Sequence, residues 1–479
     1  MNIIIVGGGS SGWITAANIV HEVPFAKVTL IDKEVPTPLG VGEATLLNFD
    51  KFLTQNCGFD RNEYLRELDV GVKAGILFPN WGKEDSTVWH PFYFRYYPFV
   101  ENMDVPMLDA WSNAQDLSIQ RLLPLYDVSL LNKVDKAQHS DNAYALHIDC
   151  LKLVKYIRKK LQGKINYIDS AVSDFDGNSL TLENGDNLSA DLFVDCTGFK
   201  SILKKNRDRV DLSDRLYVNT AVATHIQYED KEKEFYPYVS CPAVDHGWIW
   251  KIPLQSSIGS GLVFNRDITS IEEAKQYFCE HWDNRVSPDQ LKVIDWTPYY
   301  DKNQWDGNVV SIGLSAGFLE PLESTGLALI IEGSSTLVKT IRSGYYSETD
   351  IDYFNMWMRW GYEQCIDFVN MHYSLSTIDS PFWNYVRNNY KGSLALETYL
   401  KNLRSTEPSI VEGKGFIFGA INWLIWLVQM GYEMSPKPHI NHDRMKESLL
   451  YCLDREESVI DRGVDIESHI EFCENLGIV

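Results

Sequence analysis

Two charged side chains stand in apolar surroundings where they could take part in chemistry. Lys73 interrupts the run "VGVKAGILFPNW" (70–81), and Glu323 lies in "GFLEPLESTG" (317–326). Burial lowers the pKa of an amine and makes it more nucleophilic, while a carboxylate can stabilise a cation or accept a proton. Both residues also fit plainer roles, a surface lysine on an edge strand and an acid at the start of a helix. The two segments alone leave these interpretations open.

A pair of tryptophans, Trp248 and Trp250, stands two positions apart in "GWIWKIP" (247–253). Side chains at alternate positions of a strand face the same side, so both rings are expected on one face. Such a pair either packs an ordinary core or forms a wall beside a ligand. The heptapeptide by itself favours the core.

A glycine-rich segment after the first apolar run indicates a dinucleotide site. Gly7, Gly9 and Gly12 have the G-x-G-x-x-G spacing, between the strand "NIIIV" and a helical pattern. The glycines allow a tight turn and close approach to a pyrophosphate, which the helix N-terminus then binds. Asp32 ends the second predicted strand, where a carboxylate can accept hydrogen bonds from a ribose.

FAD is favoured over NAD as the dinucleotide. "GNVVSIGLSAGF" (307–318), with Gly313 and Gly317, resembles the second glycine region of flavoproteins, where a strand-to-helix loop meets the ribityl chain. A second phosphate loop for NAD(P)H is absent from the sequence as we interpret it. We therefore expect FAD to be reduced by a separate NAD(P)H flavin reductase and delivered in the reduced form.

The order of predicted elements indicates an α/β fold built on a Rossmann-type FAD-binding domain. Its pieces lie near residues 1–50, 165–200 and 305–340, and an inserted β-rich layer contains the tryptophan pair. We expect residues 1–345 to form this discontinuous core. Residues 346–479 are expected to form a helical region that completes the substrate site.

Several segments together resemble the flavin-dependent halogenases, the tryptophan-halogenase-like family. "GWIWKIP" matches the W-x-W-x-I-P motif of that family, and "GVGEAT" (40–45) matches its glycine–Glu–Ala–Thr loop. The segments around Lys73 and Glu323 match those that hold the family's catalytic lysine and glutamate. "DLFVDCTGF" (191–199) and "HYSLSTIDSPFW" (372–383) also look like family segments. The resemblance covers most of residues 1–385.

The resemblance implies a reaction and a role for each residue. Reduced FAD, O2 and a halide give hypohalous acid, which Lys73 positions or takes up as a haloamine before it halogenates an electron-rich ring. Glu323 would stabilise the cationic ring, and Ser324 would orient Glu323. Trp248 and Trp250 would form the wall that separates the flavin from the organic substrate. The residues implied at the halide are Thr325 and Gly326, and those implied in the flavin loop are Gly42, Glu43, Ala44 and Thr45.

The substrate side is less defined by the resemblance. "WHPFYF" (89–94) is similar to the family segment that stacks on an indole, which implies substrate contacts for His90 and Phe92. A late indole-sandwiching tryptophan of the free-tryptophan enzymes has no clear match, and Trp423 and Trp426 are the candidates. We therefore expect a pocket for indoles, phenols or other activated small aromatic substrates.

Composition excludes several classes of partner and location. The net charge of −22 repels phosphate backbones, which argues against nucleic acid. No stretch has the length and apolarity of a membrane span, and the apolar segment 415–432 is predicted to be a buried helix or a wall of the substrate site. The eight cysteines are scattered, so we predict reduced thiols, no metal site and a cytoplasmic protein. The sequence also leaves a homo-oligomer open. The alternatives left open are an FAD-dependent aromatic monooxygenase and a flavin-binding protein without turnover.

Overall fold

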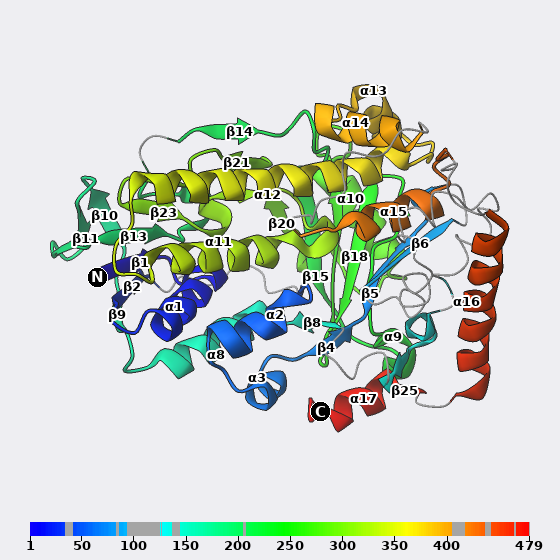
Figure 1. Cartoon of the computed structure of the whole chain (residues 1–479), viewed down its shortest axis with the longest axis horizontal. Helices are drawn as coiled ribbons and strands as arrows, with labels where there is room; N and C mark the ends of the chain where they lie inside the picture. The colour runs from blue at the N-terminus through cyan, green and yellow to red at the C-terminus, as the bar shows by residue number, and fades with distance from the viewer. Residues whose placement is uncertain are drawn as a thin grey trace.

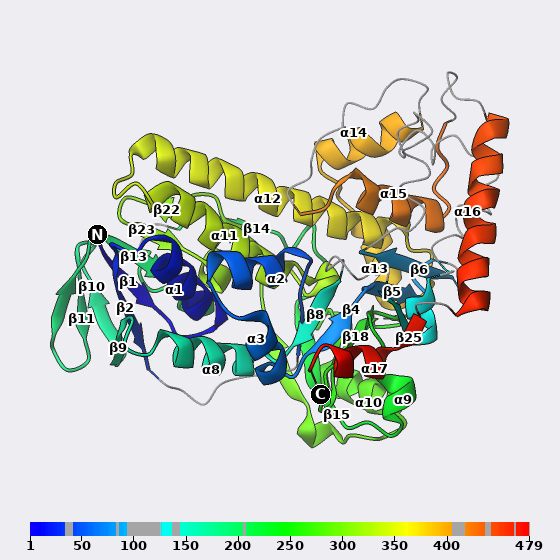
Figure 2. The ribbon, with the colours of Figure 1, turned by 60° about the horizontal axis from the view of Figure 1, so that its bottom comes forward.

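A six-stranded sheet carries the predicted nucleotide loop at the end of its first strand (Figures 1 and 2). The strands in spatial order are β22 (Trp305–Asp306), β23 (Val309–Ser311), β13 (Leu192–Asp195), β1 (Asn2–Val6), β2 (Lys27–Asp32) and β9 (Asn166–Asp169). All pairs are parallel except β22–β23. The three predicted Rossmann pieces therefore meet in one sheet.

This sheet is covered on both faces, which explains why β1 is a continuous apolar run. Ile3 and Ile5 belong to the core that includes the helices, while Ile4 and Val6 belong to the core under a small antiparallel meander. The helices are α1 (Ser10–Glu22), α8 (Cys150–Leu161) and α11 (Thr325–Ile341), and the meander is β10 (Val172–Phe175), β11 (Ser179–Leu182) and β12 (Asn187–Ser189).

A second, eight-stranded sheet forms the inserted β-rich layer. Its members are β20 (Lys292–Asp295), β15 (Thr220–Ile226), β19 (Ile258–Phe264), β18 (Gly247–Pro253), β16 (Val239–Ser240), β5 (Gly75–Pro79) and β6 (Thr87–Pro91), with β17 (Ala243–Val244) paired to β18. Helix α10 (Ile271–His281) packs on one face of this sheet. The tryptophan strand β18 lies in its interior, between β16 and β19.

A third, short sheet connects the predicted flavin loop (42–45) to the second sheet. It contains β3 (Glu43–Ala44), β8 (Ala145–Ile148) and β4 (Gly71–Lys73) in that spatial order. Only Ala74 separates β4 from β5, so the chain passes from the third sheet into the second immediately after Lys73. The backbone of Lys73 is therefore fixed at the junction of two sheets.

Helices dominate the chain after residue 345. They are α12 (Glu348–Leu375), α13 (Pro381–Asn389), α14 (Leu394–Leu403), α15 (Ala420–Gln429), α16 (His442–Arg462) and α17 (His469–Asn475), and one short strand, β25 (Ile466–Ser468), pairs with β7 (Lys133–Asp135). The long helix α12 runs beside α11, and α15 lies against β6 (Figure 1). The apolar segment 415–432 thus contains the buried helix that the sequence predicts.

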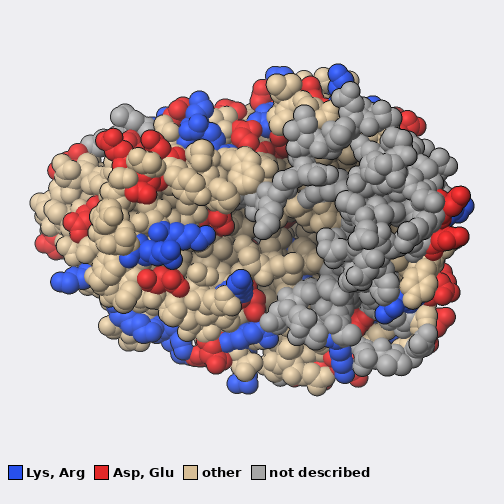
Figure 3. All heavy atoms as spheres, viewed as in Figure 1, with Lys and Arg blue, Asp and Glu red and all other residues tan. Residues whose placement is uncertain are grey.

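The structure describes residues 1–33, 42–82, 86–92, 125, 127–136, 144–204, 207–404, 417–435, 442–463 and 466–478. Motif residues 40–41 and 93–94 lie outside the described residues. No helix within these ranges combines the length and the apolarity needed to cross a bilayer. All eight cysteines are buried free thiols, as predicted. On the face shown in Figure 3, acidic and basic side chains alternate in small groups.

Candidate active site

Lys73 is completely buried, and its ammonium group is surrounded by specific partners. Nζ donates to the carbonyl oxygen of Thr45 and to Oγ of Ser324, each at 2.9 Å. It also lies 4.8 Å from the centroid of the Phe92 ring, a cation–π distance. Burial lowers the pKa of Lys73 to about 7, although the charge of Glu323 partly offsets this effect. The surface-lysine interpretation is therefore wrong, and the predicted fall in pKa is confirmed.

Glu323 is also buried, and its carboxylate faces donors from three other elements. Nδ1 of His90 lies 3.0 Å from both carboxylate oxygens. Oε1 also lies 2.7 Å from Nε2 of His372 and accepts from Nε1 of Trp426 at 3.1 Å. Burial raises the pKa of Glu323, but the two histidines outweigh burial and hold the pKa well below its usual value. The side chain does not cap α11, so the capping interpretation is wrong.

The backbone is strained where Glu323 and Ser324 meet. Their φ angles are 61° and 60°, so two consecutive residues with side chains adopt the left-handed conformation. Such residues cost free energy and persist where the surrounding structure fixes them, often at functional sites. Here the turn places Glu323 toward the histidines and the Ser324 hydroxyl toward Lys73. Ser324 contacts Lys73, whereas we predicted that it would orient Glu323.

The hydrogen-bond partners of His90 define its tautomer. Nε2 faces the Nδ2 amide of Asn422 at 2.9 Å, and with this amide orientation Nε2 is the acceptor. Nδ1 then carries the hydrogen that is donated to Glu323. His90 thus donates to the carboxylate, and we predicted it only as a substrate contact.

His372 and Glu323 form a closely coupled buried pair. Nδ1 of His372 lies 2.7 Å from the carbonyl oxygen of Phe368, which can only accept, so Nδ1 carries a hydrogen. Nε2 lies 2.7 Å from Oε1 of Glu323. Burial lowers the pKa of His372, although the hydrogen bond to Glu323 and the charge of Glu323 oppose this effect.

One face of α15 contributes further partners to the side chains around Glu323. Asn422, Trp426 and Gln429 follow at helical spacing and reach His90, Glu323 and β6 respectively. The Gln429 amide accepts from the backbone N–H of Trp89 at 2.9 Å and donates to its carbonyl at 2.8 Å, as a neighbouring strand would. Of the two late candidates, Trp426 contacts Glu323, whereas Trp423 packs against Phe368 with ring centroids 5.0 Å apart.

Trp248 and Trp250 are buried side by side, with ring centroids 6.3 Å apart. Gly261 on β19 gives the Trp250 ring its place, because a Cβ atom there would lie 2.3 Å from Cη2 of Trp250. Nε1 of Trp248 donates to the hydroxyl of Tyr373 at 2.9 Å. Both rings are therefore fixed, which suits a wall and a core equally.

The predicted FAD residues form a loop that suits a dinucleotide. A Cβ atom on Gly7 would lie 2.2 Å from the carbonyl oxygen of Cys196, and one on Gly12 would lie 1.9 Å from that of Gly7, so side chains are excluded where the chain turns. Gly9 has no atom within 4 Å of such a Cβ, which leaves its surface open to a phosphate. The Asp32 carboxylate adjoins this loop at Gly8.

The second glycine region lies against the first. A Cβ on Gly313 would lie 2.6 Å from Cβ of Ser11, in the first turn of α1. Gly317 differs, because it pairs in β24 (Gly317–Phe318) and its close contacts are with Tyr299 and Tyr362. Gly42, Glu43, Ala44 and Thr45 lie in or beside β3, and the Thr45 carbonyl connects this loop directly to Lys73.

Thr325 and Gly326 begin α11, and no side chain caps this end of the helix. Thr325 is buried, whereas Gly326 is exposed, with open space where a Cβ would lie. The first N–H groups of a helix have no intrahelical acceptor and favour an anion. This end of α11 has the donor chemistry that a halide needs. No described cluster of His, Cys, Asp and Glu side chains is arranged to hold a metal ion.

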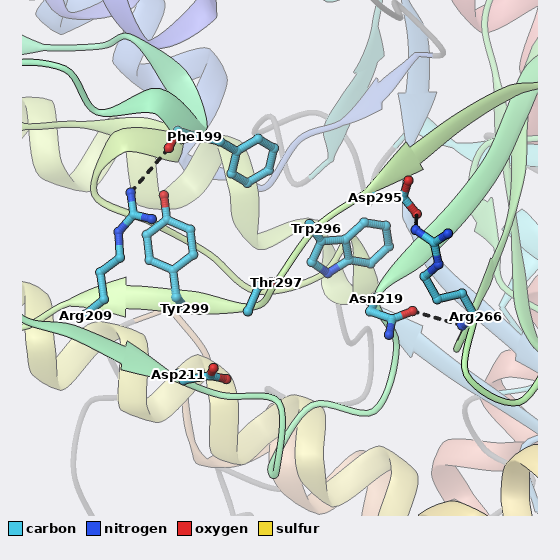
Figure 4. A pocket seen from close by; sticks show the side chains of 9 residues that line it. All are labelled: Phe199, Arg209, Asp211, Asn219, Arg266, Asp295, Trp296, Thr297 and Tyr299. Atoms are coloured by element: carbon cyan, nitrogen blue, oxygen red, sulfur yellow. Dashed lines mark hydrogen bonds and ion pairs between the residues drawn. The ribbon is translucent and has the colours of Figure 1, made fainter.

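A pocket of about 840 Å³ lies elsewhere, where β20 meets β14 (Arg209–Asp211) and β21 (Tyr299–Asp301) (Figure 4). Arg209 stacks on the Tyr299 ring, with its guanidinium carbon 4.0 Å from the ring centroid. The residues that line the pocket are Phe199, Arg209, Asp211, Asn219, Arg266, Asp295, Trp296, Thr297 and Tyr299. None of the predicted halogenation residues lines it.

The fold and these residues define a flavin-dependent halogenase. A family model described as tryptophan halogenase matches residues 2–447, so the chain belongs to the tryptophan halogenase family. It is an FADH2-dependent oxidoreductase of this class, and the predicted resemblance and fold class are confirmed.

Sequence relatives and solved structures agree with this assignment. The tryptophan 6-halogenase ThaL of Streptomyces albogriseolus is 28% identical over 453 residues, which cover 86% of this chain and 84% of that protein. The tryptophan 7-halogenase RebH of Lentzea aerocolonigenes is 29% identical over 414 residues, 80% of this chain and 78% of that protein. The flavin-dependent halogenase BrvH from Brevundimonas sp. BAL3 superposes with a TM-score of 0.81 at 25% identity, covering 99% of each chain.

Proposed function

We propose that the chain uses reduced FAD, O2 and a halide ion to halogenate an electron-rich aromatic substrate of the indole or phenol type. The observation that carries the proposal is the buried connection from Lys73 through Ser324 to Glu323, with a lysine pKa of about 7. When bound, reduced FAD would supply the chemistry by which O2 oxidises the halide to hypohalous acid. The relatives ThaL and RebH are tryptophan halogenases, which favours an indole ring among these substrates.

The nucleotide loop would hold the cofactor through Gly7, Gly9 and Gly12, with Asp32 at the ribose. The loop 42–45 and Gly313 would complete this site. The backbone N–H groups of Thr325 and Gly326 would hold the halide at the N-terminus of α11, where the helix dipole favours an anion. A flavin reductase would supply the reduced cofactor.

Lys73 transfers the electrophilic halogen to the ring. At a pKa of about 7, the ammonium form can hydrogen-bond hypohalous acid and the neutral amine can take up the halogen. The ring loses one proton and gains the halogen, and the hydroxide released from the hypohalous acid takes up a proton to give water. Glu323 remains ionised because its pKa is low. It therefore stabilises the cationic ring and accepts the proton that the ring loses.

The two tryptophans of β18 separate the oxidant-forming side from the organic substrate. His90 and Phe92 adjoin Glu323 and Lys73, so a flat ring beside them would lie within reach of both reacting groups. Helices α12 and α15, from region 346–479, complete the substrate side through His372, Asn422 and Trp426.

The experiment that tests this function is product analysis by mass spectrometry. Purified protein, FAD, a flavin reductase with NADH, air and bromide are mixed with a panel of indoles and phenols. A bromine isotope doublet on a panel member supports the proposal. Hydroxylated product without bromine would favour an aromatic monooxygenase, and FAD binding without any product would favour a flavin-binding protein without turnover.

A further inference from the structure

A second buried acid, Glu320, lies three residues before Glu323, and the proposed reaction does not use it. Its exposed fraction is 2%. Burial raises the pKa of Glu320 to about 8, although hydrogen bonds oppose the effect. Oε1 accepts from the hydroxyl of Tyr373 at 2.7 Å. Oε2 is buried and has no hydrogen-bond partner among the described residues, so it is the natural place for the acid's own proton.

The hydrogen bonds from Trp248 to Glu320 run in one direction. An indole N–H can only donate, so the Tyr373 hydroxyl oxygen accepts from Trp248 at 2.9 Å. The hydroxyl has one hydrogen, and Oε1 of Glu320 receives it. Trp248, Tyr373 and Glu320 therefore form a buried chain that joins β18, α12 and the loop before α11.

We propose that Tyr373 and Glu320 are positioning residues that fix the Trp248 ring in the wall. The inference rests on the proposed function, in which the wall keeps the organic substrate away from the oxidant. Loss of this hydrogen-bond chain leaves the buried indole N–H of Trp248 without an acceptor, which favours another orientation of the Trp248 ring. A displaced ring opens the wall, so more of the oxygen consumed appears as hydrogen peroxide or hydroxylated product.

The test compares three variants of the hydrogen-bond chain. Tyr373→Phe removes the acceptor of the Trp248 N–H, and Glu320→Leu removes the acceptor of the Tyr373 hydroxyl. Glu320→Gln keeps an acceptor for that hydroxyl. Tyr362→Phe is the matched control, because Tyr362 is a buried tyrosine of the same helix whose hydroxyl lies 3.5 Å from the carbonyl of Gly317. The first measurement is the indole ¹⁵N–¹H resonance of Trp248 in the cofactor-free protein, assigned with Trp248→Phe. We expect it to shift in Tyr373→Phe and Glu320→Leu, and to stay near its wild-type position in the other two.

The second measurement is the ratio of peroxide plus hydroxylated product to brominated product. We expect a rise of roughly tenfold in Tyr373→Phe, as the loss of one buried hydrogen bond implies. An unshifted Trp248 resonance in both acceptor-removing variants would overturn the proposed chain. A shifted resonance with an unchanged ratio would overturn its role in the wall. If the wild type forms no brominated product, the proposed function fails, while the resonance still tests the hydrogen-bond chain.

Discussion

At the scale of single residues, Lys73 is held in the core at a cost to stability. Its pKa is about 7 in the folded chain and 10.5 in the unfolded chain. Between these values the unfolded state binds more protons, so the free energy of unfolding rises with pH from about 7 to about 10.5. A buried, partly discharged lysine is unfavourable for folding and useful for halogen transfer.

Replacing Lys73 by methionine should therefore stabilise the protein. At pH 7 we expect an increase on the order of 4 kcal/mol in the free energy of unfolding, and the part of the rise with pH that Lys73 causes should disappear. Urea unfolding at pH 7 and pH 9 measures both effects. Lys292→Met, at an exposed position of β20, is the control and should change little. A variant less stable than the wild type would contradict the account.

The contact with His372 helps to keep the Glu323 carboxylate ionised, so we expect it to affect the acid limit of activity. His372→Leu removes one donor from the carboxylate, so the pKa of Glu323 should rise toward its ordinary value. A charge-assisted hydrogen bond is worth about 1.5–3 kcal/mol, which corresponds to about one to two pH units. The acidic limb of the rate profile should move up in pH by that amount. His281→Leu is the control, since the buried Nε2 of His281 has no hydrogen-bond partner among described residues, and an unmoved limb in His372→Leu would refute the coupling.

At the scale of elements, strands β18 and β19 together determine the position of the tryptophan pair that we propose as a wall. Trp250 lies directly opposite Gly261, and the absence of a side chain there makes room for the ring. The register of the sheet thus determines where the Trp250 ring lies. Helix α15 contacts a different part of the site, since Gln429 holds β6 and Trp426 donates to Glu323.

Gly261→Ala should displace the Trp250 ring and lower the melting temperature. The new Cβ would lie 2.3 Å from the ring, too close for any rotamer adjustment of alanine to relieve. Overpacking of this kind costs about 1–3 kcal/mol. Differential scanning calorimetry measures the loss. In Gly333→Ala on α11 the new Cβ has its nearest neighbour at 3.6 Å, so that control should be neutral or slightly stabilising. Equal melting temperatures for both variants would show that β19 tolerates a side chain beside Trp250.

At the scale of the whole molecule, the chain joins a nucleotide-binding sheet to a substrate-side sheet through the short segment around Lys73. Thr45, in the predicted flavin loop, and Ser324, next to Glu323, both contact the same ammonium group. In the proposed function the flavin arrives already reduced, so only the reduced flavin should be required. FAD reduced photochemically should give the same halogenated product as FAD reduced by a reductase with NADH. Product only in the presence of the reductase protein would instead indicate a direct contact between the two proteins.

Local sequence signals predicted the parts of the site that lie within continuous motifs. The glycine spacing predicted the tight turn between β1 and α1, and the segments around Lys73 and Glu323 predicted two buried charged groups, which the structure brings together at Ser324. His372 and Asn422 were missed as partners of the Glu323–His90 pair because helices far along the chain bring them there, and no local pattern encodes such a contact. His372 did stand in a recognised family segment, which was the available signal. The left-handed turn at Glu323 and Ser324 was equally invisible, since neither residue type favours that conformation.

The most direct test of the central claim separates formation of the oxidant from its transfer by Lys73. Wild type and Lys73→Met are given reduced FAD, O2, bromide and a reactive indole, and flavin reoxidation and brominated indole are measured in the same single turnover. The account predicts similar flavin reoxidation in both proteins and at least about a hundredfold less brominated indole in Lys73→Met, the scale expected when a reacting group is lost. Undiminished bromination in Lys73→Met, with FAD bound as in the wild type, would contradict it.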